Sequence, residues 1–375
     1  MPDVVRILFL ADTHLGFDLP LRPRIKRRRR GHDFLANYAT ALAPALAGEV
    51  DLVVHGGDVF NRSRPVPSLA YQAFEPLSRV ANRGIPVFIV PGNHERGRLP
   101  HIRFAQHSGI HVFDEPRTFA WEVRGVKVAL AGFPSERDGV RARFIQLLNA
   151  TRWRDIAADV RLLCLHQCVE GSTVGPGNYT FTTAPDVIRC ADIPSDFEAV
   201  LSGHIHRHQV LTRDLRGHAL GAPVLYPGSI ERTSIAEADE DKGFLLVEIV
   251  LDNGPARVNW RFQSLPARPL VRCAIDLDSC DDSGLEERLH ALLNHAPSDA
   301  VLTIRIDGTM TPHAVRLLSA ANLRALAPAT MNVELRPADV RSSSLGQSLS
   351  LGLDRERNHE QSERERESRH GHRDA

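Results

Sequence analysis

Residues 4–16 read Val-Val-Arg-Ile-Leu-Phe-Leu-Ala-Asp-Thr-His-Leu-Gly, an apolar run that ends in an acidic residue and a histidine. Such a run is typical of a buried β-strand, because it is short, rich in branched apolar side chains and bounded by polar residues and glycine. Polar, metal-binding side chains return at four further points before residue 207, nearly always directly after an apolar run. The repetition predicts a sheet whose strand ends converge on one polar site.

Five motifs carry these polar side chains. In chain order they are Asp12-Thr-His14, Gly57-Asp58, Gly92-Asn93-His94-Glu95, His166 and Gly203-His204-Ile-His206. Together they offer carboxylate, amide and imidazole groups, which bind hard or borderline divalent metals. Any one motif is explained equally well as an ordinary polar strand end, but five of them in order favour a metal site. We expect Asp12 and His14, two residues apart on extended backbone, to point to the same side.

This donor set predicts hydrolysis of a phosphoester. A phosphodiester is an anion that a weak nucleophile must attack. Two metal ions about 3.5–4 Å apart neutralise the phosphate, lower the pKa of a bound water and stabilise the leaving oxygen. We therefore interpret the motifs as a two-metal hydrolase site.

Strands that alternate with helices predict a layered α/β core. Expected strands in addition to the first are 51–55, 85–90, segments within 110–132, 160–165, 199–202, and runs within 208–228 and 243–263. Expected helices are 33–48, 67–83 and 138–150. The arrangement is a β-sandwich with helices outside, and it extends over residues 1–264.

A smaller unit is expected after a linker at 265–269. Strands at 270–278, 300–307 and 331–336 and helices at 283–295 and 311–327 form a β-α-β-α-β domain over residues 270–338. From Arg341 the composition changes to Ser, Arg, Glu, His and Gln. Residues 341–375 cannot bury enough apolar surface to offset their ordering entropy, so we expect a disordered polar tail.

Composition favours a cytoplasmic protein without a membrane segment. The 375 residues carry a formal net charge of zero and 42% hydrophobic residues, and no apolar stretch approaches the roughly 18 residues of a transmembrane helix. No signal-peptide pattern precedes the first strand. Five cysteines, an odd number without a Cys-x-x-Cys pair, indicate reduced thiols. Cys164 and Cys168 flank His166, but the histidines of the five motifs form a better matched metal set.

The series Asp-x-His, Gly-Asp, Gly-Asn-His-Glu, His and Gly-His-x-His resembles the calcineurin-like metallophosphoesterases. The resemblance implies a four-layer α/β/β/α sandwich that holds two metals. One metal would be held by Asp12, His14, Asp58 and His206, and the other by Asp58, Asn93, His166 and His204. Asp58 would bridge the two metals. His94 would act on the phosphate as a catalytic residue that is not a ligand.

Further motifs resemble a narrower group, the SbcD-type DNA repair nucleases, which include the nuclease subunit of bacterial SbcCD and its eukaryotic break-repair counterpart. These motifs are Ala11-Asp-Thr-His-Leu-Gly16, Gly175-Pro-Gly-Asn-Tyr179, Tyr226-Pro-Gly-Ser-Ile-Glu-Arg232 and Asp241-Lys-Gly-Phe244. The resemblance implies exonuclease or endonuclease cleavage of DNA by a metal-bound hydroxide, in repair or recombination. It implies Mn²⁺ as the metal, with Fe²⁺ and Zn²⁺ as alternatives, and a DNA-capping role for residues 270–338.

A basic run follows the first motif. Seven basic side chains lie within nine residues, namely Arg22, Arg24, Lys26, Arg27, Arg28, Arg29 and Arg30. We predict that they contact DNA phosphates, which would make binding salt-dependent. The alternative is a solvated surface loop.

Two other functions and two further partners stay open. A small-nucleotide phosphodiesterase or phosphoprotein phosphatase would use the same core but needs neither the basic run nor the second domain. A non-catalytic DNA-end-binding scaffold would not need an intact His94. A homodimer and an SbcC-like ATPase subunit are the partners that the resemblance suggests. No amphipathic helix pair follows residue 340, which counts against the ATPase subunit, and without a GxxxxGK[ST] motif any ATP dependence must come from another chain.

Overall fold

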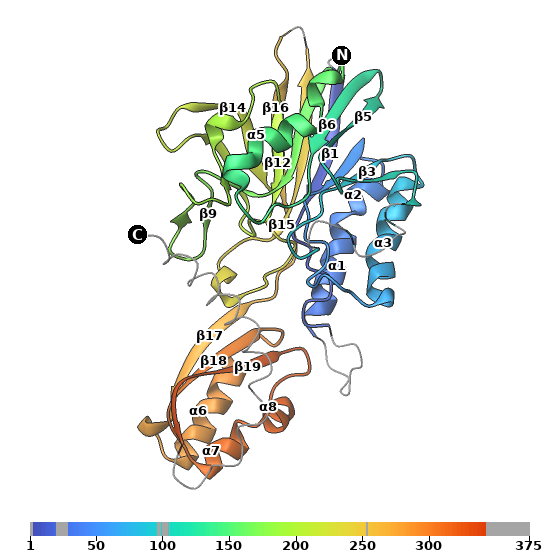
Figure 1. Cartoon of the computed structure of the whole chain (residues 1–375). Helices are drawn as coiled ribbons and strands as arrows, with labels where there is room; N and C mark the ends of the chain where they lie inside the picture. Colours follow the sequence, from blue (N-terminus) through green and yellow to red (C-terminus); the bar gives the residue numbers. More distant parts are fainter. Residues whose placement is uncertain are drawn as a thin grey trace. The chain divides into compact units, whose positions relative to one another are not determined.

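The structure is a computed structural model of the chain, and it describes residues 3–19, 29–95, 99, 104, 106–252 and 254–342. The chain divides into two compact units, Met1–Arg268 and Pro269–Ala375 (Figure 1). In the part of the chain that the structure describes, no helix combines the length and apolar character needed to cross a membrane.

The first unit contains two six-stranded sheets. The first sheet has the strand order β16-β15-β1-β2-β3-β4. Its strands are β1 (Asp3–Leu10), β2 (Leu52–His55), β3 (Val87–Ile89), β4 (Ile110–Val112), β15 (Gly243–Leu251) and β16 (Arg257–Ser264). Strands β1 to β4 are parallel, whereas β15 and β16 add to the edge in antiparallel fashion.

The second sheet has the order β13-β14-β12-β7-β6-β5. Its strands are β5 (Arg117–Val123), β6 (Val126–Gly132), β7 (Val160–His166), β12 (Ala199–Gly203), β13 (Gln209–Arg213) and β14 (Ala219–Tyr226). The central strands β6, β7, β12 and β14 are parallel, and antiparallel β5 and β13 close the two edges.

Alternating side chains on the strands create three apolar layers. On β1, Phe9 faces the second sheet in the central layer, whereas Leu8 and Leu10 face the helices. Helices α1 (Gly31–Ala41), α2 (Ala43–Leu46) and α3 (Pro67–Ala81) cover the first sheet, and α5 (Val140–Ala150) covers the second. Parallel strands are usually covered on both faces, and the predicted α/β/β/α sandwich is confirmed.

Several short elements were not expected from the sequence. Strand β8 (Cys168–Val169) pairs with β11 (Val187–Ile188), and β9 (Thr173–Val174) pairs with β10 (Tyr179–Thr180). The 3₁₀ helices are η1 (Trp153–Asp155), η2 (Cys190–Asp192), η3 (Ile235–Glu237) and η4 (Leu277–Ser279). Two-residue strands carry too little periodicity to be recognised in a sequence.

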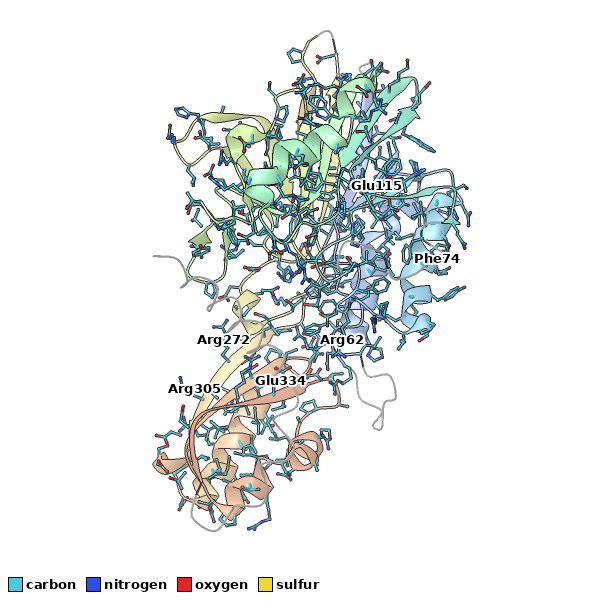
Figure 2. All side chains as sticks on the ribbon, in the orientation of Figure 1. Arg62, Phe74, Glu115, Arg272, Arg305 and Glu334 are labelled. Atoms are coloured by element: carbon cyan, nitrogen blue, oxygen red, sulfur yellow. The ribbon has the colours of Figure 1, made fainter. Side chains whose placement is uncertain are left out.

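The second unit is a three-stranded parallel sheet with helices. Its elements are β17 (Leu270–Asp276), α6 (Asp282–His295), β18 (Val301–Met310), α7 (Pro312–Leu317), α8 (Ala320–Leu326) and β19 (Asn332–Ser342). The helix expected over 311–327 is two helices, because the Ser319 hydroxyl accepts a hydrogen bond from the Asn322 N–H and caps a new helix there. Ile304 and its neighbours on the sheet pack against the helices, while Arg272, Arg305 and Glu334 are exposed (Figure 2).

Strand β19 continues to Ser342, two residues into the segment expected to be a tail. Residues 343–375 lie outside the described part of the chain.

Candidate metal centre

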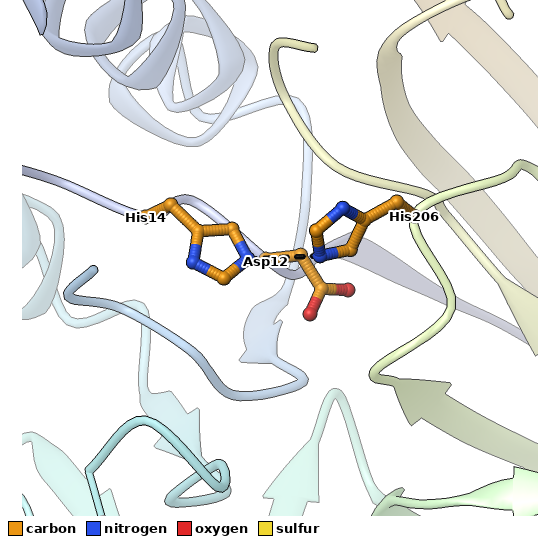
Figure 3. A group of neighbouring side chains, drawn as sticks. All are labelled: Asp12, His14 and His206. Atoms are coloured by element: carbon orange, nitrogen blue, oxygen red, sulfur yellow. Dashed lines mark hydrogen bonds between the residues drawn. The ribbon is translucent and has the colours of Figure 1, made fainter. Parts of the chain in front are cut away.

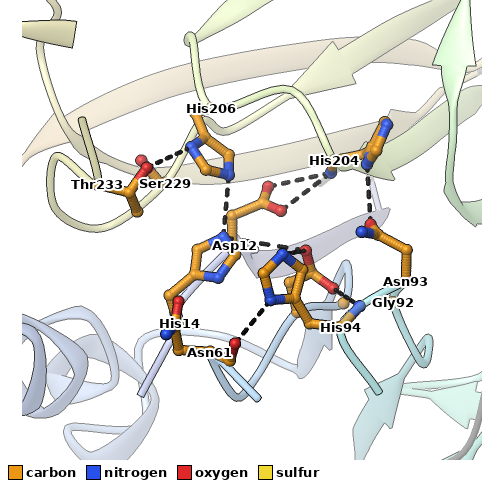
Figure 4. Close-up of polar contacts among 12 residues, drawn as sticks. Asp12, His14, Asn61, Gly92, Asn93, His94, His204, His206, Ser229 and Thr233 are labelled. Carbon is orange, nitrogen blue, oxygen red and sulfur yellow. Dashed lines mark hydrogen bonds and ion pairs between the residues drawn. The ribbon is translucent and has the colours of Figure 1, made fainter. Parts of the chain in front are cut away.

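The five motifs meet at the carboxyl ends of strands from both sheets. Figure 4 shows the members Asp12, His14, Asn93, His94, His204 and His206 around this point. The Asp12, Asp58 and Asn93 motifs follow β1, β2 and β3, while His166 ends β7 and His204 follows β12. A parallel bridge pairs Ala11, directly after β1 of the first sheet, with Ser229 in the loop that follows β14 of the second sheet. Side chains that are far apart in the sequence are thereby placed around one centre.

Asp12, His14 and His206 form the first group of donors (Figure 3). Their ligand atoms all lie within 4.8 Å of one another, and the Nε2 atoms of His14 and His206 are 2.9 Å apart. The Nε2 atom of His14 is also 3.9 Å from Oδ2 of Asp58.

Asn93, His166 and His204 form the second group. The Asn93 Oδ1 atom lies 2.9 Å from Nε2 of His166 and 3.1 Å from Nδ1 of His204. Oδ2 of Asp58 is 3.5 Å from the same His166 nitrogen. The Asp58 carboxylate thus lies next to a histidine of each group, and all seven residues expected to bind metal are brought together.

Left-handed backbone marks this site. Asp12, His14, Asp58 and His204 have φ angles of +50°, +40°, +52° and +81°, a conformation that is uncommon for residues other than glycine. The extended backbone expected for Asp12 to His14 is therefore wrong. Hydrogen bonds from the Asp12 N–H to the Gly57 carbonyl (2.9 Å) and from the His14 N–H to the Asp58 carbonyl (3.0 Å) hold the two loops together. Such strain persists where the surrounding structure enforces it, often at functional sites.

Two glycines are required by close packing at the site. Gly57 has a φ of +103°, and a Cβ atom there would lie 2.4 Å from Nδ1 of His166. A Cβ atom on Gly92 would lie 2.1 Å from Oδ1 of Asp58. Any larger residue at either position would displace an expected metal ligand.

The buried carboxylate of Glu95 ties the loops together. It accepts hydrogen bonds from the backbone N–H groups of Asp58 (3.0 Å), Phe60 (2.8 Å) and Gly92 (2.8 Å). Burial raises the pKa of Glu95 to about 8. Glu95 belongs to the third motif, but no role was expected for it from the sequence. The only feature of the sequence that could have indicated a role for Glu95 is its position directly after Asn93 and His94.

His55 connects the loops that carry Asp12 and Asp58. Its Nδ1 accepts a hydrogen bond from the Gly57 N–H (3.2 Å), so its Nε2 carries the proton that is shared with Thr13 Oγ1 (3.1 Å). Burial lowers the pKa of His55 to about 3, which keeps the ring neutral.

The electrostatics of the cluster favour a cation at its centre. Burial raises the pKa of Asp12 to about 6. Burial also disfavours the charged form of His166, but the Asp58 and Asp12 carboxylates and the Gly56 carbonyl together outweigh this effect and raise the His166 pKa to about 9. A proton on His166 thus partly neutralises the carboxylates. A divalent cation bound by the same atoms would do this more effectively, so the donor set fits divalent metals.

His94 lies at the rim of the cluster. Its Nδ1 is 2.8 Å from the Asn61 carbonyl, and its backbone N–H donates to Oδ1 of Asp58 at 2.9 Å. Its Nε2 is 3.9 Å from Oδ2 of Asp58. The His94 side chain is 37% exposed, compared with 0% for His166, so an incoming substrate could reach it.

Only the end of the basic run lies in the described residues. Arg29 pairs with Asp18. Arg30 is buried, with its guanidinium 4.9 Å from the Phe17 ring centre and donating to the Arg232 carbonyl. Arg22, Arg24, Lys26, Arg27 and Arg28 fall outside the described residues.

Comparisons with known proteins identify similar sequences. The family model described as calcineurin-like phosphoesterase matches residues 5–208. A DNA double-strand break repair protein Mre11 from Haloferax volcanii is 29% identical over 83% of this chain. The Mre11 protein of Methanopyrus kandleri is 25% identical over 65%. An SbcCD nuclease subunit from Bacillus subtilis is 28% identical over 68% of this chain and 72% of its own length. The matches span 64% and 54% of the two Mre11 proteins.

Proposed function

The chain belongs to the calcineurin-like phosphoesterase family, and from this premise we propose that it is a two-metal phosphodiesterase that hydrolyses DNA in repair or recombination. The observation that carries the proposal is the position of Asp58. Its Oδ2 atom lies 3.5 Å from Nε2 of His166 and 3.9 Å from Nε2 of His14. One carboxylate between two groups of donors is the arrangement that a bridged pair of metals requires.

We assign Asp12, His14, Asp58 and His206 to one metal and Asp58, Asn93, His166 and His204 to the other. Nitrogen and oxygen donors suit Mn²⁺, with Fe²⁺ and Zn²⁺ as the alternatives. When bound, the metals would supply positive charge for the phosphate and lower the pKa of a water molecule.

His94 is the proposed catalytic residue that binds no metal. A hydrogen bond from its Nδ1 to the Asn61 carbonyl orients the ring, so Nε2 is left to face the substrate. In the imidazolium form, which carries a second proton on Nε2, the ring can donate a hydrogen bond to the phosphate or that proton to the leaving oxygen. The partly exposed side chain is consistent with this role.

The names of the relatives support DNA as the substrate, since they describe break-repair proteins and a component of a nuclease. We propose that the basic run contacts the phosphate backbone and that the 270–338 domain caps the DNA. Partnership with an SbcC-like ATPase is supported by the name of the B. subtilis relative, a subunit of SbcCD. A homodimer is the second proposed assembly, and light scattering of the purified chain measures it directly.

The test is a cleavage assay of the purified chain with Mn²⁺, on linear duplex DNA, on single-stranded DNA, on the diester bis-p-nitrophenyl phosphate and on the monoester p-nitrophenyl phosphate. Protein from which a chelator has removed the metal and a His94→Ala variant serve as controls. Metal-dependent cleavage of DNA supports the proposal. Cleavage of the small diester without cleavage of either DNA indicates a small-nucleotide phosphodiesterase, and turnover of phosphomonoesters alone indicates a phosphatase. DNA binding without hydrolysis of any substrate indicates the end-binding scaffold.

A further inference from the structure

The loop between β14 and β15 carries two buried charged residues, Glu237 and Lys242, next to His206. Oε1 of Glu237 lies 3.2 Å from Nδ1 of His206, and its Oε2 lies 2.7 Å from Nζ of Lys242. We propose that Glu237, held by Lys242, is a positioning residue that fixes the tautomer and ring orientation of His206 and thereby sets the affinity of one metal. The inference rests on the proposed function, because it takes His206 to be a metal ligand.

The hydrogen-bond pattern defines the tautomer of His206. A carboxylate only accepts hydrogen bonds, so the His206 Nδ1 atom facing Glu237 carries the proton. The Thr233 hydroxyl lies 3.2 Å from the same nitrogen but donates its proton to Glu237 Oε1 at 2.7 Å. Nε2 of His206 is therefore left with its lone pair, on the side of the ring where His14 lies.

Lys242 contacts both the Glu237 side chain and the main chain of His206. Its side chain is fully buried, and its three donors are matched by three acceptors. Nζ donates to Glu237 Oε2 at 2.7 Å, to Glu240 Oε2 at 3.0 Å and to the His206 carbonyl at 2.9 Å. A buried ammonium is tolerated only when it is paired in this way. One residue thus connects the backbone of His206 to the carboxylate that orients its ring.

The second metal group is supported differently. Nδ1 of His166 lies 2.7 Å from the carbonyl of Gly56, a neutral acceptor. A carboxylate partner makes an imidazole more basic than a carbonyl does and binds it more firmly. We therefore expect Glu237 to matter for the metal held by His14 and His206 and not for the metal held by His166.

The experiment titrates metal-free protein with Mn²⁺ and measures the two binding constants by calorimetry. Glu237→Ala should weaken one site by about 10- to 100-fold, the usual effect of removing such a partner, and leave the other unchanged. Glu237→Gln keeps an acceptor for Nδ1 and should lose less. Glu248→Ala is the control, because Glu248 pairs with Arg6 at the surface and takes no part in this assembly; its two constants should match those of the wild-type protein. Unchanged constants in Glu237→Ala, or equal weakening of both sites, would overturn the proposal.

A second measurement is made on the wild-type protein and needs a variant only to assign the signals. Long-range ¹H–¹⁵N spectra of metal-free, histidine-labelled protein report which ring nitrogen is protonated. The His206 signals are identified by their loss in His206→Gln. At a pH where the ring is neutral, we expect the proton on Nδ1, and a proton on Nε2 would overturn the proposal. Neither readout uses DNA, so a protein that binds two Mn²⁺ but cleaves no DNA would defeat the proposed function and leave this inference standing.

Discussion

The Nε2 atoms of His14 and His206 lie 2.9 Å apart although 192 residues separate the two histidines. Two imidazole nitrogens at this distance must share a proton or face a common cation. Nδ1 of His14 is buried and has no hydrogen-bond partner among the described residues, so a proton placed there would be unsatisfied. A cation facing both Nε2 atoms requires the proton on Nδ1 of each ring, and only His206 has an acceptor for it among the described residues. The two proposed ligands are thus supported unequally.

Asp58 should be the least replaceable of the proposed metal ligands. Asp58→Asn preserves shape but removes the negative charge that two cations would share. We expect the variant to bind one Mn²⁺ instead of two and to lose measurable phosphodiesterase activity. Asp51→Asn is the control, because Asp51 lies at the other end of the same strand and pairs with Arg124. If Asp58→Asn holds two metals and turns over normally, the bridging assignment is wrong.

Removal of His94 should separate metal binding from catalysis. General acid–base groups contribute about 10²–10⁴-fold, so His94→Ala should lose cleavage by that factor while it keeps both metals and its DNA affinity. Metal content measured by atomic emission, together with kcat on bis-p-nitrophenyl phosphate, checks this. His218→Ala, which removes a histidine paired with Asp214 at the surface, should match the wild-type protein. Loss of a metal from His94→Ala would show that His94 is a ligand.

Glu95 should matter for stability as well as for the site. In Glu95→Gln the side-chain amide must face at least one of the three backbone N–H groups, and each buried donor left unsatisfied costs about 1–3 kcal/mol. We expect a fall in Tm of several degrees, at about 2–4 °C per kcal/mol for a domain of this size. Glu75→Gln, which breaks only a surface pair with Arg79, should change Tm very little. An equal Tm for the two variants would contradict the structural role of Glu95.

The sequence predicted the layers and the side chains that the fold brings together, because both depend on local patterns. Apolar runs ending in Gly-Asp or Gly-Asn-His indicate strands and their polar ends without reference to the rest of the chain. The strained backbone at Asp12 and Asp58 could not be predicted, since it arises from pairing between two loops that the sequence separates.

The supporting carboxylates were missed for the same reason. Glu95 accepts from the N–H of Asp58, 37 residues away, and Glu237 lies 31 residues from His206. An acidic residue in a loop is usually a solvated surface residue, and only the fold shows that these two are buried behind ligands. The motif around Lys242 was noticed through its resemblance to relatives, but its contacts came from the structure.

The basic run should control how DNA binding depends on salt. Each phosphate contact on duplex DNA adds about 0.9 to the slope of log affinity against log salt. Arg29 and Arg30 already have partners within the first unit, so the substitution is confined to Arg27→Ser and Arg28→Ser. We expect the slope to fall by up to about 1.8, with cleavage of bis-p-nitrophenyl phosphate nearly unchanged because the metal ligands and His94 remain.

The control removes the same charge elsewhere, with Arg83→Ser and Arg216→Ser, two exposed positions. Affinities for duplex DNA measured at several salt concentrations decide between the alternatives. A slope that falls equally in both double variants would mean that overall charge sets binding and that the run has no special role. An unchanged slope with intact DNA cleavage would make the run a solvated loop, and the case for a nucleic-acid substrate would then rest on similarity to the nucleases alone.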